Sequence, residues 1–138
     1  MSQENVENVE NVKLAIEAFN RRDADAFVAL ASPDVEWEDG IFWSGVSRIY
    51  RGRDELRDWF EQVVEPWASI HLDAEEFIEA SDGRLLVGLR LTARGEGSGA
   101  DTRMHAWQVN WFTDGKTGRR QVFRERAEAL EAAGLSSS

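Results

Sequence analysis

The sequence predicts an α+β fold, because helical and strand-like patterns occupy different parts of the chain. Apolar residues recur every three or four positions in much of the first half, as in amphipathic helices, and alternate in the second half, as in strands. Helices gathered before a run of antiparallel strands favour a curved sheet with helices on one face. The 138 residues fit one domain, which we place at residues 1–135, with a flexible tail at 136–138.

Three helices are expected before the sheet. The first covers residues 3–21, and its apolar residues have helical spacing: Val6, Val9, Val12, Ile16 and Phe19. Asp23 is placed to cap a short second helix, which ends before Pro33. The third covers residues 53–65. Its helically spaced apolar residues are Leu56, Phe60, Val63 and Trp67.

The stretch VEWEDGIFWSG, at residues 35–45, sets three acids among large apolar side chains. A strand over residues 35–38 points its two glutamates to one face, away from the apolar residues. If the strand continues, Asp39 lies on the same face as Trp37. Residues 40–51 are expected to form an irregular loop rich in aromatic side chains. The pattern therefore leaves one carboxylate that can face an apolar interior.

The second half predicts a meander of strands and a last helix. The expected strands cover residues 69–79, 85–93, 103–112 and 116–125. The sequence TDGK is a hairpin signal, and we favour a three-residue loop with Gly115 in the left-handed conformation. The segment RAEALEAAG forms a short helix that stops at Gly134.

The composition argues against several classes of function. A net charge of −10 would repel nucleic acid and anionic membranes. The chain has no cysteine and no histidine pair at metal-binding spacing, so we expect no metal site, while magnesium held by carboxylates stays open as an alternative. No apolar run is long enough to span a bilayer, and the polar N-terminus is unlike a signal peptide, so we expect a cytoplasmic protein.

Three segments resemble the SnoaL-like families of the nuclear transport factor two-like superfamily, which includes the ketosteroid isomerases. They are AIEAFNRRDADAFVALASPDVEWED, YRGRDELRDWF and WFTDGKTGRRQVFRERAEALEAAGL, and the resemblance extends over nearly the whole chain. It implies a cone-shaped, curved antiparallel sheet wrapped around the N-terminal helices and enclosing a pocket. It also implies a homodimer through the convex face of the sheet. The fold hosts isomerases, cyclases, epoxide hydrolases and non-catalytic binders, so it does not decide the activity.

The resemblance also implies a site. The general base of the ketosteroid isomerase branch falls on Asp39, where an apolar pocket would raise its pKa toward neutrality. The expected pocket for a hydrophobic small molecule contains Trp37, Trp43, Tyr50, Phe60, Gln108, Asn110, Arg120 and Val122. Cofactor-free proton transfer on a carbonyl compound, of the isomerase or cyclase type, would use the polar members as donors.

Two departures from the family pattern favour an alternative, a non-catalytic ligand-binding or dimerisation module. The isomerase tyrosine falls on Ala15, and its second acid falls near Gln108, whose amide is a weaker donor. An aspartate of the limonene epoxide hydrolases falls on Val122, which argues against that chemistry. Asp39 itself could instead make a turn before Gly40.

The face of the strand over residues 103–112 that lines the pocket depends on the hairpin. A three-residue loop pairs Phe112 with Lys116 and sets Gln108 opposite Arg120. Hydrophobicity alone would send the face with Trp107 to the core, whereas the resemblance sends the Gln108 face to the pocket. We follow the resemblance. Arg120 could then bind an anionic or enolate oxygen, or pair with Asp39, and His105 falls on the outer face.

Overall fold

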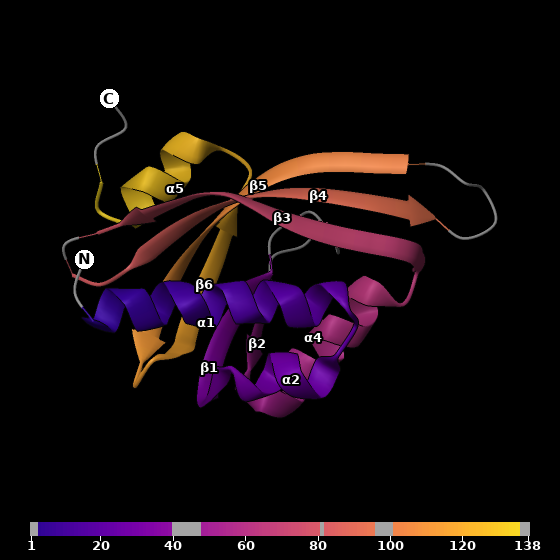
Figure 1. The fold of residues 1–138 in the computed structure, drawn as a ribbon, viewed down its shortest axis with the longest axis horizontal. Helices are drawn as coiled ribbons and strands as arrows, with labels where there is room; N and C mark the ends of the chain where they lie inside the picture. The colour runs from indigo at the N-terminus through magenta and orange to yellow at the C-terminus, as the bar shows by residue number, and fades with distance from the viewer. Residues whose placement is uncertain (1–2, 40–47, 81, 96–100, 136–138) are drawn as a thin grey trace.

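The computed structural model describes residues 3–39, 48–80, 82–95 and 101–135, and Figure 1 shows the arrangement of its elements. Trp43 and the tail at 136–138 lie outside these residues. The helices are α1 (Gln3–Asn20), α2 (Ala24–Ala29), α4 (Gly52–Val64) and α5 (Arg126–Ala132). The strands are β1 (Ala31–Asp39), β2 (Arg48–Arg51), β3 (Trp67–Glu79), β4 (Leu85–Gly95), β5 (Asp101–Thr113) and β6 (Lys116–Phe123).

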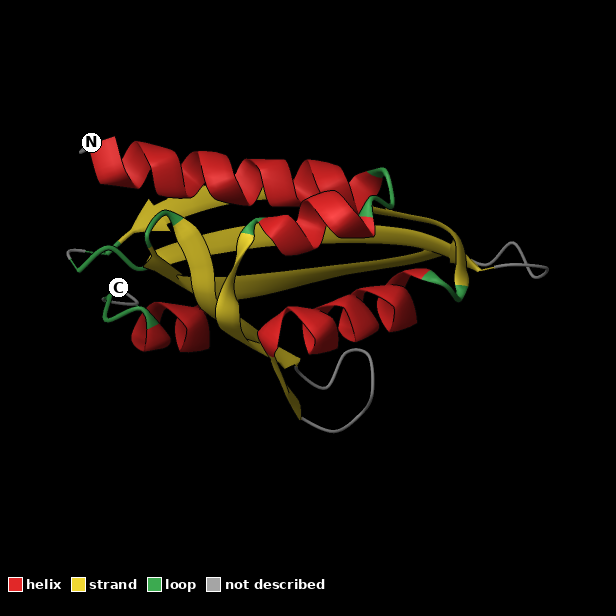
Figure 2. Cartoon of the chain, turned by 90° about the horizontal axis from the view of Figure 1, so that it is seen from below, coloured by secondary structure: helices red, strands yellow, loops and turns green. Residues whose placement is uncertain are grey.

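One six-stranded sheet organises the molecule, in the order β2-β1-β6-β5-β4-β3. Neighbouring strands are antiparallel, except that β1 and β6 run parallel. The sheet curves, with α1 on its inner face and the C-terminal α5 on its outer face (Figure 1). Figure 2 shows the length of α1 running beside the strands. The predicted α+β fold, with a curved sheet around N-terminal helices, is confirmed.

The first strand is longer than the sequence pattern indicates. It begins at Ala31 and contains Pro33, which cannot donate a ladder hydrogen bond. The pairing with β6 shifts register between Ala31 and Glu36, so Pro33 lies in an irregular stretch of the ladder. The expectation of a loop throughout residues 40–51 was wrong for the last four, which form β2 and place Tyr50 beside Trp37. Trp67 begins β3 and is not part of the helix before it.

The β5–β6 hairpin turns over two residues and not three. Asp114 and Gly115 have φ values of 52° and 79°, and two positive φ values are typical of a type I′ turn. Thr113 therefore pairs with Lys116, and the expected pairing of Phe112 with Lys116 is wrong. The left-handed conformation predicted for Gly115 is present.

A bulge next to the hairpin restores the side-chain faces that the prediction assigned. The shorter turn moves the register by one residue, which alone would exchange the two faces of a strand. Gly118 is skipped in the ladder and moves the register by one more. Asn110 therefore pairs with Arg120, and Gln108 pairs with Val122 rather than with Arg120. The inner face still carries these four side chains.

The two faces of the sheet bury different apolar clusters. On the inner face an aromatic cluster joins the helices to β1: Phe19, Phe27, Trp37, Trp59 and Phe60. The rings of Phe27 and Phe60 are 5.0 Å apart between centroids, a separation at which aromatic pairs add about 1 kcal/mol beyond burial. On the outer face, α5 packs on Leu86, Val109 and the half-buried Trp107 and Trp111.

Candidate functional site

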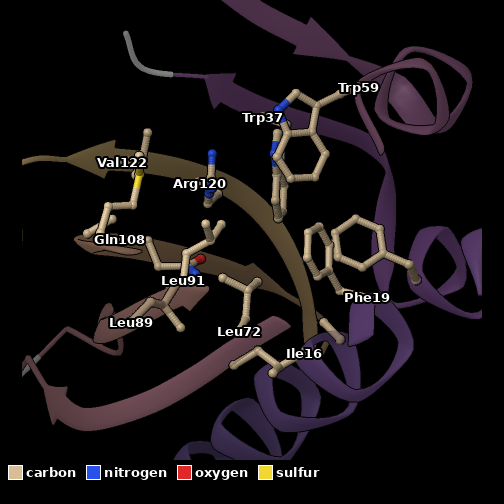
Figure 3. Close-up of a pocket in the computed structure, with 14 residues that line it drawn as sticks. Ile16, Phe19, Trp37, Trp59, Leu72, Leu89, Leu91, Gln108, Arg120 and Val122 are labelled. Atoms are coloured by element: carbon tan, nitrogen blue, oxygen red, sulfur yellow. The ribbon is translucent and has the colours of Figure 1, made fainter. Parts of the chain in front are cut away.

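A cavity of about 60 Å³ lies between the helices and the inner face of the sheet. Its lining is mostly apolar and comes from helices and strands alike (Figure 3). Polar side chains in this lining, among the residues that the structure describes, are Gln108, Arg120 and the indoles of Trp37 and Trp59. The apolar lining residues are Ala15, Ile16, Phe19, Phe27, Leu72, Leu89, Leu91, Met104, Ala106 and Val122.

Strand alternation brings these groups to one place. Residues two apart on a strand share a face, so Leu89 and Leu91 of β4 both line the cavity. On α1, Ile16 and Phe19 are three residues apart and therefore lie on one side of the helix. The cavity is small compared with the several hundred Å³ of a drug-sized ligand site, and in this form it suits a small ligand or part of one.

Arg120 extends from β6 beside the rings of Trp37 and Trp59 (Figure 3). Its guanidinium carbon lies 4.4 Å from the ring centroid of Trp37 and 5.4 Å from that of Trp59. The side chain is buried, and its Nη1 donates a hydrogen bond of 2.7 Å to the carbonyl oxygen of Glu38. Burial lowers the pKa of Arg120 to about 10, while the charges of Asp39 and Glu38 act in the opposite direction. Arg120 therefore stays cationic at neutral pH.

Asp39 ends β1 on the same face as Trp37, and its residue is only 1% exposed. Its Oδ1 has no hydrogen-bond partner in the described part of the chain. Burial raises the pKa of Asp39 to about 6, against the smaller lowering effects of the Arg120 charge and the Trp59 indole N–H. That indole is near the carboxyl, but Trp59 Nε1 and Asp39 Oδ1 do not meet hydrogen-bond geometry. Asp39 is thus a buried carboxylate that titrates near neutral pH.

The structure brings together four of the residues expected in the pocket. Trp37, Gln108, Arg120 and Val122 line the cavity. Asp39 is not among the described lining residues, but it interacts with Arg120 and Trp59, which are. The carboxylate therefore lies behind the cavity wall.

Three other expected pocket residues are buried elsewhere. Tyr50 packs in the core, where its hydroxyl donates to Oε1 of Gln62 at 3.3 Å, and it is not among the described residues that line the cavity. Phe60 is occupied by its contacts with other rings of the aromatic cluster. Asn110 is 2% exposed, and its Nδ2 has no partner within the described ranges.

The aromatic wall made by Phe19, Phe27 and Trp59 was not predicted from the sequence as part of the pocket. Phe19 belongs to the apolar helical pattern of the first helix, and both phenylalanines are buried in the core cluster. Trp59 lies three residues after Leu56, on the same helical stripe as Phe60, so periodicity could have identified it. His105 is on the outer face, with Nδ1 3.0 Å from Oε1 of Glu75.

The cavity can hold and polarise a small organic molecule. Its lining is mostly apolar, and an interaction with the Arg120 charge is stronger in such surroundings than in bulk water. The amide of Gln108 can donate to or accept from the same ligand.

In the described ranges no three His, Asp or Glu side chains gather to hold a metal ion, and no helix is long and apolar enough to cross a membrane.

Comparison with known proteins identifies related sequences and folds. The SnoaL-like domain family matches over residues 12–119. No curated protein matches the sequence. Among solved structures, an NTF2-like protein of unknown function from Burkholderia pseudomallei is 26% identical, with 100% of each chain covered and a TM-score of 0.74.

Two structures of lower sequence identity share the fold. One is an enzyme, and the other was solved with a bound small molecule. An epoxide hydrolase/cyclase-like enzyme of pyran ring formation in salinomycin is 20% identical, with a TM-score of 0.72 over 87% of this chain and 92% of that one. A Mycobacterium tuberculosis protein, solved with estradiol-17β-hemisuccinate, is 12% identical, with a TM-score of 0.73 over 87% and 95% of the two chains.

Proposed function

Since this chain belongs to the SnoaL-like domain family, we propose that it binds a small, mainly apolar carbonyl compound in the inner cavity and catalyses proton transfer on it without a cofactor. The observation that carries the proposal is the buried carboxylate of Asp39 beside an apolar cavity that also presents Arg120 and Gln108. A small-molecule role is supported by two proteins of similar fold, one named for a role in pyran ring formation in salinomycin and the other solved with estradiol-17β-hemisuccinate.

Asp39 is the general base in this proposal. A pKa of about 6 leaves it ionised at neutral pH yet basic enough to remove a proton from carbon next to a carbonyl. The electron pair of the broken C–H bond moves to the carbonyl oxygen and forms an enolate. In a cyclisation the enolate carbon then attacks a second carbonyl, whose oxygen receives the electron pair of its π bond and takes the proton from Asp39. In an isomerisation another carbon takes back the proton from Asp39.

Arg120 and Gln108 stabilise the enolate oxygen. Both line the cavity, and a buried cation or amide donor lowers the energy of a developing negative charge more than water would. The Arg120 guanidinium is oriented before the substrate enters, by Trp37, Trp59 and the Glu38 carbonyl. Removing one such donor typically slows catalysis by about a hundredfold to a thousandfold.

A non-catalytic binding module is the second candidate. Asp39 is not among the described residues that line the cavity, and a base must come within hydrogen-bond reach of the proton that it removes. In this reading the carboxylate balances the charge of Arg120, and the protein carries or senses its ligand.

The two candidates are separated by deuterium exchange. Carbonyl compounds that raise the melting temperature of the wild type are incubated with it in D₂O, and NMR follows exchange of the hydrogens next to the carbonyl. We expect the wild type to accelerate exchange and Asp39→Asn to lose at least a hundredfold of that acceleration, since an amide cannot accept the proton.

Glu36→Gln is the matched control, because Glu36 is exposed on the opposite face of β1. This variant should accelerate exchange of the hydrogens next to the carbonyl as much as the wild type does. A ligand that binds all three proteins and is exchanged by none of them would reject catalysis and leave the binding module.

We also propose that the domain extends over residues 1–135, that it works in the cytoplasm and that it dimerises through the outer face of the sheet. The dimer is supported by Trp107 and Trp111, which α5 leaves half-buried. A cytoplasmic location is consistent with the absence of cysteine.

A further inference from the structure

Arg120 has more hydrogen-bond donors than its protein partners use. A guanidinium offers five N–H groups, and one of them, at Nη1, reaches the Glu38 carbonyl oxygen. Its Nε is buried and has no partner in the described part of the chain. An unsatisfied buried donor is costly, and Arg120 lines the cavity, so a ligand with acceptor oxygens could use the donors that the described residues leave unpaired.

The other unsatisfied groups of the lining are donors too. Nε1 of Trp37 and Nε1 of Trp59 are both buried without a partner within the described residues. The nearby buried acceptor is Asp39 Oδ1, which is itself unpaired. The Trp59 indole N–H lies near that carboxyl, so the charged group that the described cavity wall offers to a ligand is the Arg120 guanidinium, whose N–H groups complement an anion with two acceptor oxygens.

We propose that the ligand of this cavity is a small monocarboxylate with an apolar body, held by the guanidinium of Arg120. This inference rests on the proposed function, because it names the chemical class that the same cavity takes: Arg120 then holds the carboxylate of the carbonyl compound, and Gln108 is the donor that faces the enolate oxygen. The planar guanidinium matches a carboxylate with two parallel hydrogen bonds, a geometry that a lysine could not supply. The indole rings hold the guanidinium plane in place, and the leucines and phenylalanines receive the apolar body.

The ionised carboxylate of Asp39 opposes this binding. It lies near enough to Arg120 to affect its charge equilibrium, so a second anion at Arg120 meets a like charge. Neutralising Asp39 should therefore strengthen carboxylate binding while it abolishes proton transfer. The same substitution thus has opposite effects on the two proposals.

Pentanoate and pentanamide test the inference, because they have the same shape and differ in charge. Dissociation constants are measured by NMR titration at pH 7.5 on the whole protein. We expect pentanoate to bind the wild type about tenfold more tightly than pentanamide, as a charge-assisted pair of hydrogen bonds implies. Asp39→Asn should increase that preference, and Arg119→Met should leave it unchanged, since Arg119 lies on the outer face over Trp111.

Arg120→Met should abolish the preference. If that variant does not fold, Asp39→Asn/Arg120→Met removes both buried charges and serves in its place. Equal binding of the two compounds by the wild type, or a preference that survives in either Arg120 variant, would overturn the inference. Failure of the proposed proton transfer has a different signature: the preference for pentanoate persists, and no ligand undergoes exchange.

Discussion

The burial of Asp39 makes the free energy of unfolding depend on pH, because its Oδ1 has no direct partner among the described residues. Its pKa is raised from 3.8 to about 6, so between these values the folded protein holds a proton that the unfolded chain releases. The stabilising contribution is complete below about pH 3.8 and is lost as the pH rises through about 6. It amounts to about 3 kcal/mol, at 1.36 kcal/mol for each tenfold change in proton affinity.

We therefore predict that Asp39→Asn gains stability relative to the wild type as the pH rises. Urea unfolding at pH 4.5 and 7.5 measures the difference in free energy of unfolding between the two proteins. That difference should shift in favour of the variant by about 2 kcal/mol across this range, because at pH 4.5 part of the full effect is already lost. Glu36→Gln, an exposed change on the same strand, serves as the comparison. A difference independent of pH would show that the raised pKa is wrong.

At the scale of single residues, alternation along β1 correctly predicted Asp39 on the inner face with Trp37, because side chains on a strand alternate with a period of two. The sequence could not show that Asp39 would stop behind the cavity wall. Nor could it show that Phe60 would turn toward other rings and not toward the cavity. Both outcomes depend on how helices pack on the sheet, which involves residues distant along the chain.

At the scale of elements, the helices followed from their apolar periods and the long strands from alternation. The short β2 was missed because four residues, RIYR, carry too little alternation to separate a strand from a loop. The hairpin was predicted with the wrong length, since TDGK fits two-residue and three-residue turns. The inner face of β5 was nevertheless correct, because the bulge at Gly118 compensated for the shorter turn.

The turn itself yields a prediction. Gly115 has φ of 79°, and a Cβ added to it would meet no atom within 4 Å, so a substitution there is resisted by backbone strain alone. Gly115→Val should lower the free energy of unfolding by about 1–2 kcal/mol, the cost of a left-handed residue with a side chain. Gly115→Asn should cost less, because asparagine tolerates this conformation. Equal losses in urea unfolding would argue against the type I′ turn.

For the whole molecule, the decisive choice concerned which face of the sheet forms the inner wall. Trp107 and Trp111 make the outer face of β5 more hydrophobic than the Gln108 face, so hydrophobicity alone favoured the wrong side. The resemblance to SnoaL-like proteins gave the observed orientation. The physical reason is that α5 covers part of the tryptophan face, while the inner face keeps polar groups around a cavity.

The part of the outer face that α5 does not cover makes the homodimer testable. There His105 is exposed, stacks near Trp107 and pairs with Glu75. If two copies meet on this face, His105→Glu sets a second acid beside Glu75 and should shift a dimer toward monomer. Leu14→Glu introduces the same charge on exposed α1 and should leave the dimer intact.

Sedimentation equilibrium at tens of micromolar, an order of magnitude above many specific dissociation constants, measures both variants. A wild type that is monomeric there would reject the dimer, and the half-buried tryptophans would then belong only to the packing of α5. A wild-type dimer that survives His105→Glu but not Leu14→Glu would place the interface on α1. That outcome would leave the outer face of the sheet exposed and would set the second copy against α1, the helix whose Ile16 and Phe19 line the cavity.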